Sequence, residues 1–222
     1  MDQELFKRIL SSLILIPLSL FFIIEGSFYF IFFLWIIFLF SSLEWINMNK
    51  KIELKILGII FLSISLFSTY YFREKAGIGA FLFVIIICLS TDIGGYIFGK
   101  LFKGPKLIKI SPNKTYSGMI GSFLLALSFS YLFEILIDRY IPQYNWSLLN
   151  LSDLSFIIII ILISMVSQIG DLIISYFKRL SKVKNTGKII PGHGGLLDRI
   201  DGMIFAIPFS YLIIYIYFNM IL

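Results

Sequence analysis

Residues 154–165, LSFIIIIILISM, decide the class of fold. They belong to an apolar run that extends over about 154–177. A strand of a transmembrane barrel alternates apolar and polar residues, because its two faces meet lipid and lumen, and this run does not alternate. A helix needs about 20 mostly apolar residues to cross a bilayer. The run therefore predicts a membrane-spanning helix.

The rest of the chain repeats this pattern. Hydrophobic residues make up 59% of the 222 positions and charged residues 14%, against about 25% charged residues in soluble domains. We predict an all-α, polytopic integral membrane protein with about seven spans, or more if a long segment contains a re-entrant piece. The expected spans cover residues 9–24, 28–46, 54–72, 78–98, 117–137, 154–177 and 202–221.

The basic residues predict how the chain is oriented. Cytoplasmic segments of membrane proteins are enriched in Lys and Arg. With the N-terminus in the cytoplasm, the inside segments hold 16 of the 19 Lys and Arg residues. The outside segments hold only Arg73, Lys75 and Arg139. We therefore expect a cytoplasmic N-terminus, with the segment 178–201 also facing the cytoplasm.

The net charge and the cysteine content exclude several partners. A net charge of +6 is better explained by basic residues that flank spans and meet anionic lipid than by nucleic-acid binding. We expect a lipid bilayer as partner and no nucleic acid. Cys88 is the only cysteine, so neither an intramolecular disulfide nor a thiolate metal cluster can form.

Acidic residues inside apolar spans are the first functional candidates, because a charge in the membrane is costly. Asp92 and Asp171 lie near the ends of two expected spans. Ser167, Asp171, Ser175 and Lys178 fall on one helical face, which must contact protein or water and not lipid. An inter-helix salt bridge would explain this polar stripe as well as a catalytic role would.

A second candidate region is PGHGGLLDRID, residues 191–201. Its glycines allow close backbone approach to a ligand, and such loops expose N–H groups that can hold phosphate oxygens. Asp198 and Asp201 lie one turn apart within a basic segment, which suits a hard divalent cation that also binds phosphate. The pattern predicts phosphoryl or nucleotidyl transfer with metal assistance. We expect His193, the only histidine, to donate to phosphate or to brace the loop.

Two stretches then resemble a known family. SYFKRLSKVKNTGKIIPGHGGLLDRID (175–201) is similar to the signature of the phosphatidate cytidylyltransferases, also called CDP-diacylglycerol synthases. STDIGGYIFGKLFKGPKLIKISPNKTYSGMIGS (90–122) is similar to the family's Asp-containing turn and its SPxKTxxG loop. The resemblance extends from about residue 80 onward, whereas the N-terminal spans match only in hydrophobicity.

The resemblance implies an activity, cofactors and partners. The family transfers CMP from CTP to phosphatidic acid, giving CDP-diacylglycerol and pyrophosphate. It also implies Mg²⁺ with a second cation in a paired centre, a homodimer, and a bacterial inner-membrane enzyme whose active site faces the cytoplasm. For the domains, it implies one transmembrane catalytic domain over 1–222, with N-terminal spans in 1–75 and a core in 76–222 whose cytoplasmic loops are 99–116 and 178–201.

Carried over position by position, the resemblance also assigns roles. The implied metal ligands are Asp171 and Asp198, with Asp201 as an additional or outer ligand. The implied catalytic residues are Asp171, Asp198, Lys178 and Arg199. The implied substrate-binding residues are Ser111, Lys114, Lys178, Arg179, Lys184, His193, Gly194 and Gly195, with Asp92 and Arg199 beside them. Lys114 is equally well explained as an interfacial anchor.

One position departs from the family pattern, which has Asp where this chain has Asn185. Either the family residue is a metal ligand, or it is a turn residue for which Asn and Asp are nearly equivalent. We favour the turn residue.

Three other functions compete with this interpretation. DRIDGMIFA (198–206) begins like the CDP-alcohol phosphatidyltransferase motif D-x-x-D-G-x-x-A-R, but Phe205 and Ala206 stand where Ala-Arg is required, and no Asp follows Asp201. An ion-coupled transporter could use Asp92 and Asp171, yet it does not need the basic glycine loop. A CTP-dependent lipid kinase would release CDP instead of pyrophosphate.

Overall fold

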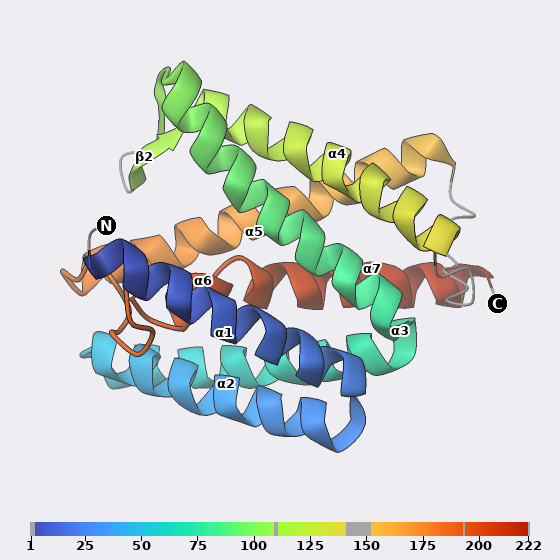
Figure 1. The fold of residues 1–222 in the computed structure, drawn as a ribbon. Helices are drawn as coiled ribbons and strands as arrows, with labels where there is room; N and C mark the ends of the chain where they lie inside the picture. Colours follow the sequence, from blue (N-terminus) through green and yellow to red (C-terminus); the bar gives the residue numbers. More distant parts are fainter. Residues whose placement is uncertain (1–2, 109–110, 141–151, 193, 222) are drawn as a thin grey trace.

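The computed structural model describes residues 3–108, 111–140, 152–192 and 194–221, and it is dominated by long helices (Figure 1). In chain order these are α1 (Gln3–Glu25), α2 (Ser27–Met48), α3 (Ile52–Phe102), α4 (Tyr116–Tyr140), α5 (Asp153–Leu180), the short α6 (Leu197–Ile200) and α7 (Met203–Ile221). Within the described residues, α1 to α5 are long and apolar enough to cross a membrane. The prediction of a helical membrane protein is confirmed at this level.

Helix α3 contains two of the predicted spans. Its 51 residues are interrupted at Gly77, whose backbone angles (φ 83°, ψ 166°) are not helical. This positive φ favours glycine, which has no Cβ to clash with the backbone. The chain reverses there, so that the two halves of α3 run through the bundle in opposite directions (Figure 1). The gap expected between residues 72 and 78 is thus a kink within α3 and not a loop.

The expected loop 99–116 contains regular secondary structure. Helix α3 continues to Phe102, and two strands follow: β1 (Lys106–Ile108) and β2 (Ser111–Thr115). They pair antiparallel, with Lys106 opposite Thr115 and Ile108 opposite Ser111. This short hairpin is a local exception to the all-α fold that the long helices otherwise confirm, and its mixed polar and apolar residues give no clear strand pattern.

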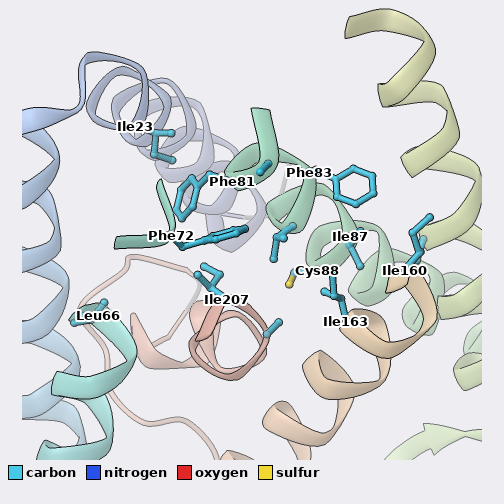
Figure 2. Packing of buried hydrophobic residues seen from close by; sticks show 14 of the residues in the cluster. Ile23, Leu66, Phe72, Phe81, Phe83, Ile87, Cys88, Ile160, Ile163 and Ile207 are labelled. Atoms are coloured by element: carbon cyan, nitrogen blue, oxygen red, sulfur yellow. The ribbon is translucent and has the colours of Figure 1, made fainter. Parts of the chain in front are cut away.

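Helix α3 forms the centre of the bundle. Its buried side chains Phe72, Phe83 and Ile87 join Ile160 of α5 and Ile207 of α7 in one apolar cluster (Figure 2). Close van der Waals packing of this kind holds membrane helices together, because lipid tails are as apolar as the side chains. Small residues bring α4 near: a Cβ on Gly94 would lie 2.4 Å from the carbonyl oxygen of Gly121.

The connections alternate between two ends of the bundle (Figure 1). The N-terminus, the β1–β2 hairpin and the connection from α5 through α6 to α7 lie at one end, and the kink of α3 and the C-terminus lie at the other. At the kink end, Arg73 donates to the carbonyl oxygens of Ile23 and Ile24 and so caps α1. The basic segments predicted to be cytoplasmic therefore gather at one end.

Candidate active site

A cavity of about 400 Å³ lies between α3, the hairpin, α4, α5 and the segment around α6. The charged residues that line it are Asp92, Lys114, Asp171, Lys178, Asp198, Arg199 and Asp201. Ser111 and Asn185 also line it. Segments that are separated by up to about 110 positions in the sequence thus bring most of the predicted site residues to one place.

The stripe of polar residues on α5 faces protein, as predicted. Ser167 and Ser175 are 1% and 8% exposed. Asp171 accepts a hydrogen bond from the Ser175 hydroxyl at 3.2 Å and forms a 2.6 Å ion pair with Lys114. Lys114 also donates to the carbonyl oxygen of Gln168. The ammonium group of Lys114 is therefore held against α5 inside the cavity.

Asp171 has a second acidic neighbour, Asp201, in the turn before α7. The backbone of this turn packs closely on α5: a Cβ on Gly170 would lie 2.9 Å from the carbonyl oxygen of Asp201, and one on Gly202 would lie 2.4 Å from the Ser167 hydroxyl. The Asp171 and Asp201 carboxyl groups lie close enough to influence each other's charge. Burial, followed by the charge of Asp171, raises the pKa of Asp201 well above its ordinary value. We call these two residues the carboxylate pair.

Asp198 lies in different surroundings. Its Oδ1 is 2.8 Å from the Lys178 ammonium, and its Oδ2 accepts from the backbone N–H groups of Thr186 (2.9 Å) and Gly195 (3.2 Å). The side chains of Asp198 and Lys178 are only 9% and 12% exposed. Both carboxylate oxygens are thus bonded within the protein, and Asp198 ties the end of α5 to two parts of the following loop.

The glycine loop uses its own N–H groups. Gly194 donates to the carbonyl oxygen of Ile190 at 3.1 Å and accepts from its N–H at 2.9 Å, while the N–H of Gly195 is bonded to Asp198. Gly194 has a φ of 95°, which a residue with a Cβ would rarely adopt. These two glycines shape the loop in this structure, and their contact with substrate stays a prediction.

The remaining predicted residues lie outside the cavity lining or outside the described residues. Arg179 and Lys184 are exposed at the same end of the bundle and do not line the cavity. His193 lies outside the described residues.

Glu44 of α2 is the residue that sequence reasoning missed. It is 3% exposed and accepts hydrogen bonds from the backbone N–H groups of Leu196 and Leu197 and from the Thr186 hydroxyl, at 2.8 to 2.9 Å. A signal was available, because Glu44 is an acidic residue inside an expected span. The family resemblance, which extends from about residue 80 onward, does not reach Glu44.

Helix α1 also contacts the loop. Arg8 donates to the carbonyl oxygen of Gly192 at 2.8 Å, and the Ser11 hydroxyl donates to that of Pro191 at 3.2 Å. The N-terminal helices therefore support the site, although they contribute none of the charged cavity residues.

The carboxylate oxygens of the carboxylate pair are ligands that suit a divalent cation. Among the described residues, no group of three or more Asp, Glu, His or Cys side chains is close enough together to hold a metal ion by itself. Mg²⁺, however, is usually bound by one or two carboxylates together with substrate phosphates and water. Two neighbouring carboxylates also repel when both are ionised, unless a cation lies between them.

Comparisons with known proteins show the family of this chain. The family model described as the cytidylyltransferase family matches residues 49–217. The chain belongs to the cytidylyltransferase family. The match contains every residue that the sequence predicted for the site, but it begins after Glu44. The family match thus covers the cavity and leaves out the two helices that hold its loop.

Named relatives of this cytidylyltransferase family member are bacterial. A phosphatidate cytidylyltransferase of Rickettsia felis is 34% identical over 215 residues, which are 95% of this chain and 92% of the relative. One of Rickettsia bellii is 36% identical over 217 residues, 95% of this chain and 91% of the relative. A phosphatidate cytidylyltransferase of Staphylococcus saprophyticus is 38% identical over 154 residues, 69% of this chain and 55% of the relative.

Proposed function

We propose that this protein transfers CMP from CTP to phosphatidic acid, giving CDP-diacylglycerol and pyrophosphate. The observation that carries the proposal is the similarity to phosphatidate cytidylyltransferases over more than nine tenths of both chains. The cavity supports it, because lysine, arginine and aspartate side chains line one space at one end of a membrane bundle. A lipid substrate can keep its tails in the bilayer while its phosphate reaches that space.

In the proposed reaction an oxygen of the phosphatidate phosphate attacks the α-phosphorus of CTP. The new P–O bond forms while the bond to the oxygen that bridges the α- and β-phosphorus breaks, and pyrophosphate leaves. Both substrates are anionic, so their approach is repulsive. Lys114, Lys178 and Arg199 are the cationic residues at the cavity that offset this repulsion and stabilise charge on the leaving group. A phosphate nucleophile is ionised at neutral pH and needs no general base.

We propose Mg²⁺ as the cofactor, held by Asp171 and Asp201, with Asp92 lining the same cavity. When bound, the cation supplies charge neutralisation of the phosphates. Asp198, also expected as a ligand, lines the same cavity, and its oxygens bond Lys178 and two loop N–H groups. A second cation and a homodimer remain proposals that rest on the family resemblance.

The activity test uses purified protein with phosphatidic acid, Mg²⁺ and CTP that carries one label in the cytosine and another in the γ-phosphate. We expect the cytosine label in a lipid-soluble product and the γ-phosphate label in pyrophosphate. A CTP-dependent lipid kinase would place the γ-phosphate label in the lipid and release CDP. A transporter would convert neither label. Either of the last two results contradicts the proposal.

We propose that the end of the bundle bearing the cavity faces the cytoplasm of a bacterial inner membrane, with all seven expected spans crossing it. The support is the gathering of the basic segments at that end (Figure 1) and the excess of Lys and Arg in cytoplasmic segments generally. The test uses a Cys88→Ser background with single cysteines at Ser181, near the cavity end, and at Lys75, near the kink. An impermeant thiol reagent on intact cells should label position 75 only. Labelling of position 181 alone would reverse the orientation.

A further inference from the structure

We propose that Glu44 of α2 is a positioning residue for the active site: it holds the loop that presents Asp198, the ion-pair partner of Lys178 on α5, to the cavity. Glu44 lies outside the segment matched by the family model, and it touches the loop and not the cavity. The inference rests on the proposed function only for its kinetic readout.

The contacts of Glu44 join two parts of the loop. One carboxylate oxygen accepts from the N–H of Leu196, and the other accepts from the N–H of Leu197 and from the Thr186 hydroxyl. A buried carboxylate is costly unless donors surround it, and bonds to an ionised acceptor are stronger than neutral ones. These three bonds therefore fix residue 186 beside residues 196 and 197.

Asp198 binds the same two parts of the loop from the other side. Its Oδ2 accepts from the N–H groups of Thr186 and Gly195, and its Oδ1 faces the Lys178 ammonium. Thr186 thus donates its hydroxyl to Glu44 and its N–H to Asp198. A displacement of the loop from Glu44 would move the donors that orient the Asp198 carboxylate.

The loop is shaped around this carboxylate. A Cβ on Gly187 would lie 2.4 Å from Glu44 Oε1, and a Cβ on Gly195 would lie 2.6 Å from Glu44 Oε2. Any side chain at either position would push the loop away. Gly195, which the sequence assigned to substrate binding, thus has a second reason to be glycine.

The residue next to Glu44 is held in place by contacts with α3 and α5. The neighbouring Trp45 is 4% exposed, donates from its indole Nε1 to the carbonyl oxygen of Leu54 at 2.8 Å, and packs edge-on against Phe177 with ring centroids 5.0 Å apart. Phe177 precedes Lys178 on α5. The end of α2 is therefore held against the helix that carries Lys178, which makes Glu44 a fixed reference point for the loop.

The test compares Glu44→Gln with Glu53→Gln, an exposed glutamate at the start of α3. The amide keeps the size of the side chain but turns one acceptor oxygen into a donor, which cannot accept from the loop. We expect kcat to fall about 10- to 100-fold, because small displacements of reacting groups can cost about two decades in rate. Hydrogen exchange over residues 194–198 should accelerate at least about tenfold, while peptides from α4 keep the wild-type rate. Glu44→Asp should recover part of both properties, and Glu53→Gln should change neither.

Two results would overturn the proposal. One is wild-type kcat together with wild-type exchange at 194–198 in Glu44→Gln. The other is faster exchange spread over all helices, which would make Glu44 a residue of general stability. If Glu44→Gln does not accumulate, the same measurements on Thr186→Val, which removes one donor to Glu44, decide in the same way. If the wild-type protein makes no CDP-diacylglycerol, the proposed function fails while the exchange data still decide the role of Glu44.

Discussion

Two acidic groups border the same loop of this protein, and their surroundings differ. In the carboxylate pair, Asp171 on α5 lies near Asp201 in the turn before α7, where the two backbones pack closely. In the second group, Glu44 and Asp198 each accept several N–H or O–H donors. The oxygens of the pair are bonded to Ser175, Lys114 and the adjacent Gly202, whereas the oxygens of the second group join two parts of the loop.

This difference suggests that one group binds a cation and the other holds the loop in place. Like-charged carboxylates in contact disfavour each other's ionisation and gain most from a bound cation. Carboxylates surrounded by backbone N–H groups are already satisfied, so removing them leaves buried donors without partners. The carboxylate pair is thus suited to a ligand, and the Glu44 and Asp198 group is suited to holding the loop. The following substitutions test that division.

The largest effect is expected for Asp171→Asn. Turnover should fall at least about 100-fold, the scale of losing one electrostatic contact to the transition state. The melting temperature should change little, because the Lys114 ion pair is partly exposed and such pairs contribute about 0–1 kcal/mol, while repulsion with Asp201 is relieved. The measurements are CDP-diacylglycerol formation at increasing Mg²⁺ and thermal unfolding in detergent. Near-normal turnover at saturating Mg²⁺ would remove Asp171 from the metal site.

Asp198→Asn should reduce turnover less, by about tenfold or somewhat more, but it should also lower stability. The substitution leaves the Lys178 ammonium without its buried partner, and breaking a buried pair costs about 3–5 kcal/mol. A loss of that size lowers the melting temperature by about 6–20 °C in a chain of this length. The Mg²⁺ concentration for half-maximal activity should stay at the wild-type value. A large rise in that concentration with unchanged stability would indicate that Asp198 is a metal ligand. The division between the carboxylate pair and the Glu44 and Asp198 group would then be wrong.

The smallest effect is expected for Asn185→Asp. Asn185 is exposed and lines the cavity, and Lys184 and Lys188 flank it in the sequence. A new carboxylate there would mainly pair with lysines, an effect of about 0–1 kcal/mol, so activity should change by less than about tenfold. Titration of activity with Mg²⁺ checks this. A shift of the midpoint to a much lower Mg²⁺ concentration would show that position 185 contributes a ligand.

Much of the fold followed from local properties of the sequence. The apolar runs predicted the long helices, and the gap between two runs coincides with the kink of α3 at Gly77. The β1–β2 hairpin was not predicted, because strands of three and five residues are too short to show a clear alternation. The number of helices that cross the membrane remains a prediction beyond the five long apolar helices.

The sequence predicted which residues form the site, but it did not predict which residues they contact. The residues around Asp171 and in 191–201 were correctly grouped, since the cavity is lined by Asp171, Asp198, Arg199 and Asp201 together. Their partners within the protein were not predicted: Asp198 forms an ion pair with Lys178, and Lys114 forms one with Asp171. Spacing along one helix predicts which residues share a face, but it does not predict what another helix places opposite that face.

The sequence by itself determined that the chain forms apolar helices, that its basic segments gather at one end, and that its chemistry lies in two short motifs. These are properties of single segments, because hydrophobicity and helical periodicity act over neighbouring residues. Only the tertiary structure decided that Asp171 meets Asp201 and that Glu44 holds the loop. The bond from Leu196 to Glu44 spans 152 positions, and a contact at such a separation depends on how α1, α2, α5 and α7 pack against one another.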